Sequence, residues 1–329
     1  MLHPQAQALL DLIAERGLPA THTLAPVDAR TFYRDRRGFT QPDTPDVGSV
    51  RDTRCDGPRG PIPVRLYRPL GRAGASASDT ALLPVLVYCH GGGWTIGDLD
   101  THDVLCRELC NNAGVAVVAV DYRMGPEDPF PAAVDDCLTA TYWVHRHARE
   151  LHVDATRLAI GGDSAGGNLA AVVAIAARDA GDLPIAWQLL IYPATDMRRG
   201  HPSHTTNGSG YLLTTETISY YHDNYVADPG HDLDWRASPL LCEDLSRLPP
   251  ALVLTAGFDP LRDEGLAYAD RLVAAGNRAT YVCFERQIHG FITMGKVIDE
   301  AHAAVRLCGA ELARALVPES ELSSVTTPA

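Results

Sequence analysis

The sequence predicts an α/β fold in which a doubly wound, mostly parallel central sheet is flanked by helices. Two observations support this prediction: short apolar runs without polar alternation recur along the chain, and segments with helical periodicity separate them. Such runs are typical of strands that are buried on both faces of a parallel sheet. The regular order of strand and helix fits the same sheet, because parallel neighbours are usually connected through a helix.

The elements follow in order along the chain. Segments 49–55 and 62–69 flank the turn-rich DGPRG, so we expect an antiparallel pair at the sheet edge. The strands of the main series are predicted at 84–89, 115–120, 157–162, 187–192, 251–257 and 280–285. The helices are predicted at 102–111, 131–150, 165–179, 261–275 and 298–316.

Two regions interrupt this alternation, and we expect them to form one lid over the end of the sheet. Residues 1–45 combine a helix-like start with a charged segment that fits no strand, and residues 195–248 contain one predicted helix, TTETISYYHDNYV. The core would then comprise residues 46–194 and 249–317. A small-residue surface loop is expected at 72–80, and a flexible tail at 318–329.

The charge of the chain argues against nucleic acid as a partner, since 28 basic and 41 acidic residues give a net charge of −13. The longest apolar run, 169–177, is about half of the ~20 residues that span a bilayer, and Asp11 interrupts the N-terminal run too early for a signal peptide. Eight cysteines without a CxxC pair do not resemble a secreted disulfide framework. We therefore expect a soluble, cytoplasmic protein without a membrane span, acting as a monomer or a homodimer.

One set of residues has the spacing of a metal site. His102, Cys106 and Cys110 recur every four residues, so a helix would place them on one face. No fourth ligand is evident, and a buried face of cysteines is the commoner reason for such a pattern. We therefore predict no metal.

A glycine-flanked serine stands between a predicted strand and a predicted helix. Residues 162–166 read GDSAG, which is G-x-S-x-G in the context that a nucleophile elbow requires. Only small residues fit at the two outer positions of so sharp a turn, and the following helix directs its dipole and the N–H of Ala165 towards an anion on the substrate. The alternative is an ordinary glycine-rich turn with Ser164 as helix N-cap.

A second glycine cluster, HGGGW at 90–94, follows an earlier strand and favours the elbow. An acyl-transfer enzyme needs backbone N–H groups that point at the tetrahedral oxyanion, and a glycine run supplies them without obstruction. We predict Gly92 and Gly93, with Ala165, as these donors, and a structural role for His90. Phosphate binding is the other use of such glycines, but GxGxxG and the Walker lysine are absent.

The serine needs a base and an acid. In α/β-hydrolases these follow the serine in the order acid, then histidine, each just after a strand. Asp259 directly follows one predicted strand and His289 follows the next, and only this pair meets both conditions. Asp263 and Glu264 lie about one helical turn further on and should point elsewhere.

The motifs HGGGW, DYR-x-x-PE-x-PFPAA, GDSAGGN, DPLRDEG and HGF occur in this order and resemble the hormone-sensitive-lipase family of esterases, the bacterial family IV group of the α/β-hydrolase superfamily. The resemblance covers nearly the whole chain, including the N-terminal lid segment. It implies an α/β-hydrolase fold with a helical cap, and it gives Ser164, Asp259 and His289 the roles of nucleophile, acid and base.

One departure from the family pattern is visible. Between Arg123 and Pro126 the family usually has Leu-Ala, whereas this sequence has Met124 and Gly125. The departure leaves the three proposed catalytic residues untouched and concerns the packing of that loop.

The resemblance implies a carboxylic ester hydrolase that acts on short-chain acyl esters, with a small-molecule ester as its partner and no metal or organic cofactor. Two alternatives stay open at this point. Amidases and arylformamidases use the same residues on the same fold, and the plant gibberellin receptors resemble this family as non-catalytic binders that have lost the histidine, which is present here as His289.

Overall fold

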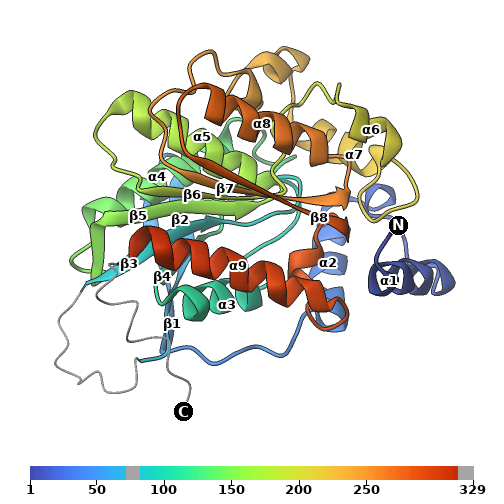
Figure 1. Ribbon diagram of the computed structural model, residues 1–329, viewed down its shortest axis with the longest axis horizontal. Coiled ribbons are helices and arrows are strands. Elements are labelled where there is room, and N and C mark those ends of the chain that lie inside the picture. Colours follow the sequence, from blue (N-terminus) through green and yellow to red (C-terminus); the bar gives the residue numbers. More distant parts are fainter. Residues whose placement is uncertain (72–81, 318–329) are drawn as a thin grey trace.

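The computed structural model describes residues 1–71 and 82–317, and within them the strands form one eight-stranded sheet (Figure 1). The expected surface loop at 72–80 and the expected tail at 318–329 lie outside the described residues. The strand order is β1-β2-β4-β3-β5-β6-β7-β8. The strands are β1 (Ser49–Gly57), β2 (Gly60–Arg68), β3 (Leu83–Cys89), β4 (Ala116–Val120), β5 (Val153–Asp163), β6 (Trp187–Ile191), β7 (Ala251–Phe258) and β8 (Ala279–Ile288).

The pairing confirms the predicted mostly parallel sheet. β1 pairs antiparallel with β2, and β2 pairs antiparallel with β4, while every later pair is parallel. β1 lies at the edge, as the turn-rich link between the first two strands predicted. The carboxyl ends of the parallel strands therefore meet at one edge, which is where side chains from consecutive strand ends can converge.

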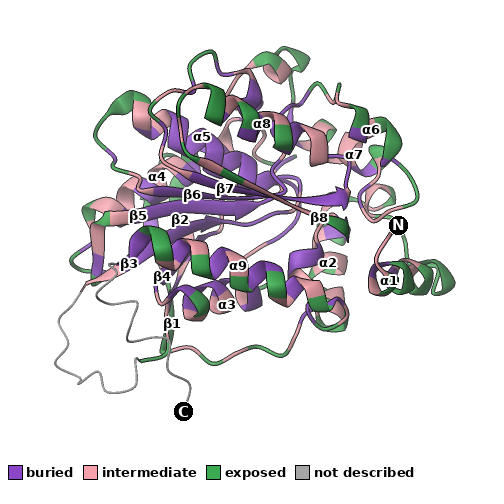
Figure 2. Cartoon of the chain, in the orientation of Figure 1, coloured by how far each residue is buried: buried purple, intermediate pink, exposed green. Residues whose placement is uncertain are grey.

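Helices cover both faces of the sheet, so that the central strands are buried between them, while the edge strands β1 and β8 are partly exposed (Figure 2). In β3 the residues alternate between two cores: Val85 and Val87 belong to one, Leu86 and Tyr88 to the other. One face carries α3 (Asp103–Ala113) and α9 (Asp299–Leu316), and the other carries α4 (Ala132–Arg146), α5 (Ala165–Ala180) and α8 (Arg262–Ala274). Each predicted helix of the main series is present, with ends shifted by a few residues.

Four further helices gather near the carboxyl ends of the strands (Figure 1). They are α1 (Pro4–Glu15), α2 (Pro26–Thr40), α6 (Pro202–Thr206) and α7 (Thr215–Tyr225), and they come from the two regions that interrupt the alternation. α2 was not expected as a helix, because its sequence is rich in charged residues. Ion pairs hold it to the body of the protein: Arg30 binds Glu127 at 2.6 Å, and Arg34 binds Asp98.

Across the described ranges, every helix is too short or too polar to traverse a lipid bilayer.

Candidate active site

Ser164 occupies a sharp turn between β5 and α5. Its backbone has φ 55° and ψ −118°, a strained conformation for a residue with a side chain. The turn tolerates only glycine at its flanks: a Cβ on Gly162 would lie 2.3 Å from the carbonyl oxygen of Cys89, and one on Gly166 would lie 1.9 Å from the same atom. The close approach of Cys89 therefore explains why glycine stands at both outer positions of G-x-S-x-G, as a nucleophile elbow requires.

Two further residues join Ser164 from neighbouring strand ends. His289, directly after β8, has Nε2 2.9 Å from Oγ of Ser164 and Nδ1 2.7 Å from Oδ2 of Asp259. Asp259 follows β7, is fully buried, and accepts a second hydrogen bond at Oδ1 from the N–H of Leu261. The structure thus brings the three sequence-predicted side chains into one hydrogen-bonded series.

The two neighbouring acids point elsewhere, as predicted. Asp263 accepts a hydrogen bond from the N–H of Ser203 and pairs with Arg262. Glu264 is buried and binds Nε2 of His204 at 2.6 Å and the N–H of Thr195 at 2.6 Å. Glu264 is thus a structural link between α8 and the segment after β6, a role that its position in the sequence did not indicate.

The three predicted oxyanion donors lie close to the serine. Gly92 and Gly93 line the same cleft as Ser164, with φ of 123° and 59° that favour glycine, and Ala165 is the first residue of α5. Within residues 1–71 and 82–317, the N–H groups of Gly92, Gly93 and Ala165 form no hydrogen bond. They are therefore free to donate to an oxyanion. The N–H of Gly91, by contrast, is already bound to Oδ1 of Asp163 at 2.9 Å.

Asp163 anchors the glycine loop, a contact that sequence reasoning missed. Its buried carboxylate accepts hydrogen bonds from Tyr88 at 2.8 Å and from Gly91, and Nε2 of His102 lies 3.3 Å away. Burial alone would raise the pKa of this carboxyl, but His102 and the hydrogen bonds hold the pKa below its ordinary value. Asp163 therefore stays ionised and fixes the loop at its first glycine.

His90 supports the same loop from inside the protein. Its ring is buried and stacks on Tyr122 with centroids 4.2 Å apart, and Nδ1 lies 2.8 Å from the carbonyl oxygen of Gly91. Burial, followed by the neighbouring His102, lowers the pKa of His90 to about 4. A neutral ring in this place pins the loop, in agreement with the structural role that we predicted.

The residues with metal-like spacing do not form a site. His102 turns to Asp163, while Cys106 and Cys110 are buried in the core, where the thiol of Cys110 donates to the carbonyl oxygen of Val115. In the described part of the chain no group of three or more potential ligands is arranged to hold a metal ion.

The departure at Met124 and Gly125 has a packing reason. A Cβ on Gly125 would lie 2.0 Å from the carbonyl oxygen of Asn224 in α7, so the loop and this helix are closer than an alanine would allow. The N–H of Gly125 donates to the carbonyl oxygen of Trp94, whose ring stacks on Tyr225 at 4.6 Å. The glycine therefore connects α7 to the end of the oxyanion loop.

A cleft of about 530 Å³ leads to Ser164 and His289. Its walls come from α1, α2, α7 and the segments beside them. Most of the surface that lines it is apolar, and the apolar side chains include Leu9, Ile13, Phe32, Leu213, Ile218 and Met294.

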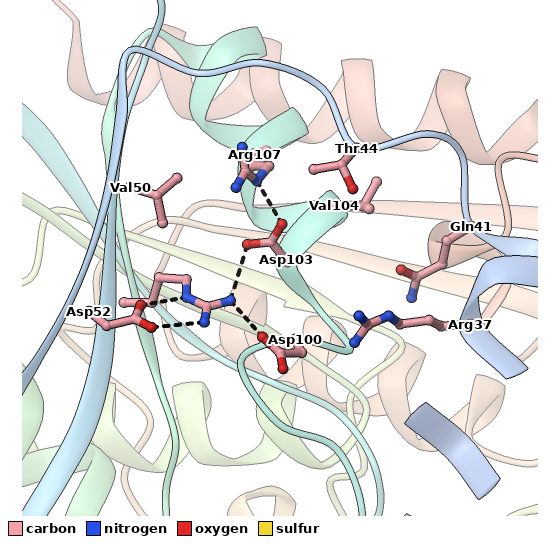
Figure 3. A pocket seen from close by; sticks show the side chains of 10 residues that line it. Arg37, Gln41, Thr44, Val50, Asp52, Asp100, Asp103, Val104 and Arg107 are labelled. Carbon is pink, nitrogen blue, oxygen red and sulfur yellow. Dashed lines mark hydrogen bonds and ion pairs between the residues drawn. The ribbon is translucent and has the colours of Figure 1, made fainter. Parts of the chain in front are cut away.

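A second cavity, of about 410 Å³, is polar, and Ser164, His289 and Asp259 are not among the residues that line it (Figure 3). At its centre Arg65 binds Asp52 at 2.6 Å and Asp100 at 2.9 Å, and Asp103 bridges Arg65 to Arg107. These charges neutralise one another and connect β1 and β2 to α3. The ion pairs that line this cavity therefore have a structural role.

Comparison with known proteins agrees with this geometry. The α/β hydrolase fold family matches residues 86–293. Carboxylic ester hydrolase LipN of Mycobacterium tuberculosis is 48% identical over 252 residues, which make up 74% of this chain and 65% of that protein, so the match spans just under two thirds of LipN. Ethyl acetate hydrolase of Pseudomonas putida is 40% identical over 311 residues, 91% of this chain and 95% of that protein.

A solved structure extends the likeness to three dimensions. Ester hydrolase EH1AB1 from the metagenome of Lake Arreo, in complex with a bipyridine phosphonate derivative, is 43% identical, with a TM-score of 0.91 over 95% of this chain and 99% of that one. The chain therefore belongs to the α/β-hydrolase fold family, within its hormone-sensitive-lipase-like, bacterial family IV group of carboxylic ester hydrolases.

Proposed function

We propose that this protein is a serine carboxylesterase that hydrolyses short-chain acyl esters through Ser164, His289 and Asp259. The observation that carries the proposal is the unbroken series of hydrogen bonds from Oγ of Ser164 through His289 to the buried carboxylate of Asp259. A serine, a base within hydrogen-bond reach and a third group that orients the base are the parts of nucleophilic acyl transfer.

Each residue has one task in the proposed reaction. His289 removes the proton from Ser164 as Oγ attacks the ester carbonyl, and Asp259 holds the tautomer of the ring and stabilises the imidazolium. The free N–H groups of Gly92, Gly93 and Ala165 bind the oxyanion of the tetrahedral intermediate. His289 then gives its proton to the leaving alcohol, and water repeats the sequence to release the acid. Side chains and backbone amides suffice for every step, so the proposal includes no metal or organic cofactor.

Residues 1–45 and 195–248 form a cap over this site in the proposed division of the chain, and residues 46–194 and 249–317 form the core. The contribution of α1, α2 and α7 to the cleft wall supports the division. Small esters are the proposed substrates, which the name of the ethyl acetate hydrolase relative supports. All eight cysteines are free, in keeping with the proposed cytoplasmic location, and we propose a monomer or a homodimer.

The test is turnover of p-nitrophenyl esters of increasing acyl length by the wild type and by Ser164→Ala. Loss of the nucleophile should reduce kcat by about 10⁴-fold or more while circular dichroism stays unchanged. A phosphonate ester should add one covalent group to the wild type and none to Ser164→Ala, as read by intact mass. Substantial turnover by a folded Ser164→Ala protein would refute the proposed mechanism.

A further inference from the structure

The wall of the substrate cleft carries arginines that lack an acidic partner. Four guanidinium groups line the cleft, and in the described part of the chain none of them pairs with a carboxylate: Arg16, Arg36, Arg37 and Arg199. Some arginines elsewhere are neutralised, for example Arg65 by Asp52 and Arg123 by Asp136, whereas other arginines, such as the exposed Arg146, stand outside the cleft. In a chain with a net charge of −13, these four arginines concentrate positive charge at the wall of one cleft.

The carboxylates of the cleft do not neutralise these arginines. Asp163 is held by Tyr88 and Gly91, Asp196 by Arg198 at 2.8 Å, and Glu264 by His204. Asp35 is the remaining acid in the described lining; it is exposed and forms no ion pair. The unpaired positive charge is therefore available to a ligand.

Among these four arginines, Arg36 acts on Tyr221, an aromatic ring that packs against the oxyanion loop. Its guanidinium carbon lies 5.3 Å from the ring centre of Tyr33 and 5.1 Å from that of Phe32. Burial and then the charge of Asp163 raise the pKa of the Tyr33 phenol, while Arg36 opposes the shift, so both charges act on this one ring. Burial also raises the pKa of Tyr221 to about 12, although the positive charge of Arg36 acts to lower it. The ring of Tyr221 is packed so closely on Gly93 that a Cβ there would lie 2.1 Å from it.

Stacking on two rings leaves the hydrogen-bonding edge of Arg36 unused. An aromatic face holds a guanidinium plane and restricts its orientation, but it accepts none of the N–H groups. A carboxylate matches that free edge with two parallel hydrogen bonds. A doubly charged phosphate fits less well, since the cleft wall is mainly apolar and the protein as a whole repels anions.

We propose that Arg36 selects ester substrates that carry a second, ionised carboxylate, such as half-esters of dicarboxylic acids. This inference rests on the proposed esterase function and adds the substrate class. Arg36 is a specificity residue, because it binds a remote group of the substrate and takes no part in the chemical step.

The experiment compares two matched pairs of esters at low salt. The carboxylate is on the acyl part in one pair, mono-p-nitrophenyl adipate against p-nitrophenyl hexanoate, and on the alcohol part in the other, the acetate ester of 6-hydroxyhexanoic acid against hexyl acetate. We expect kcat/KM to favour the charged ester in one pair, mainly through KM, and the pair that responds identifies the side of the cleft. Arg36→Met should reduce this preference at least about ten-fold, and Arg36→Lys should retain part of it.

The readout is a ratio of two substrates on one protein, so general damage to α2 cancels. The matched control is Arg146→Met, which removes an exposed guanidinium that lies 5.1 Å from the ring centre of Tyr142 in α4 and does not line the cleft; its ratio should equal that of the wild type. Added sodium chloride should lower the wild-type preference.

An unchanged ratio in Arg36→Met, or no preference in the wild type, would overturn the inference and leave the esterase function standing. If Ser164-dependent turnover were absent for all four esters, both the inference and the proposed esterase function would be overturned.

Discussion

Oδ2 of Asp259 lies 2.7 Å from Nδ1 of His289, and the other oxygen of the same carboxylate is held by the N–H of Leu261. Both oxygens are thus occupied, and the carboxylate is fully buried. An acid fixed at both oxygens can orient the histidine only in the tautomer that leaves Nε2 free to accept the serine proton. The assignment of each neighbouring acid can therefore be tested one by one.

Asp259→Asn should reduce kcat/KM by at least about 10²-fold, because an amide no longer specifies the tautomer of His289 or stabilises its imidazolium. The matched control is Asp263→Asn, whose carboxylate binds Ser203 and Arg262 instead. Steady-state kinetics at one pH, with thermal melts, provide the measurement. Loss of activity in Asp263→Asn with Asp259→Asn nearly normal would contradict our assignment.

Asp163→Asn should lower kcat about ten-fold with a smaller change in KM. The amide oxygen can still accept a hydrogen bond from Tyr88 or Gly91, but the negative charge that attracts these donors and His102 is lost. The glycine loop is then held less firmly, and with it the free N–H groups of Gly92 and Gly93. Tyr88→Phe removes one of the same hydrogen bonds and should have a weaker effect. If the two variants lost the same amount of kcat as each other, and the same amount of thermal stability, the cause would be a general packing defect instead.

Gly125→Ala should destabilise the protein by about 1 to 3 kcal/mol, because the added methyl group collides with the carbonyl oxygen of Asn224 and forces α7 away from the loop. Urea unfolding measures the change. Gly38→Ala is the control, since Gly38 lies in α2 and a methyl group added there would meet no atom within 4 Å, so this variant should be neutral or slightly stabilised. Unchanged stability in Gly125→Ala would contradict the predicted collision with α7.

The main sheet and the three proposed catalytic residues were predictable because their signals are local. An apolar run identifies each buried strand, and Ser164, Asp259 and His289 each stand beside the end of one, so the parallel topology alone brings them together. Strand ends were less predictable: β5 begins at Val153 and β8 continues to Ile288, beyond the apolar runs, because backbone pairing with a neighbour extends into polar residues.

The contacts that sequence reasoning missed are long-range and polar. Asp163 stands inside the serine motif, but its partner Gly91 is 72 residues away, and no periodicity links them. α2 is rich in charged residues and is held by ion pairs of Arg30 and Arg34 with distant loops. Such partners are set by tertiary packing, which a single sequence does not encode in any local pattern.

The stability of the protein should depend on pH through Asp121, at the end of β4. Burial, followed by the negative charge of Asp98, raises the pKa of Asp121 to about 6, and its carboxylate forms no hydrogen bond within the described residues. A carboxyl whose pKa is higher in the folded than in the unfolded state favours folding below its unfolded pKa, and this contribution is lost as pH rises through the folded pKa. Asp121→Asn should therefore be more stable than the wild type at about pH 8, by about 1 to 3 kcal/mol, and nearly equal to it at about pH 4. Urea unfolding at both pH values measures the difference, with Asp270→Asn, an exposed carboxylate, as the control. A constant offset between Asp121→Asn and the wild type at both pH values would mean that Asp121 does not titrate in this range.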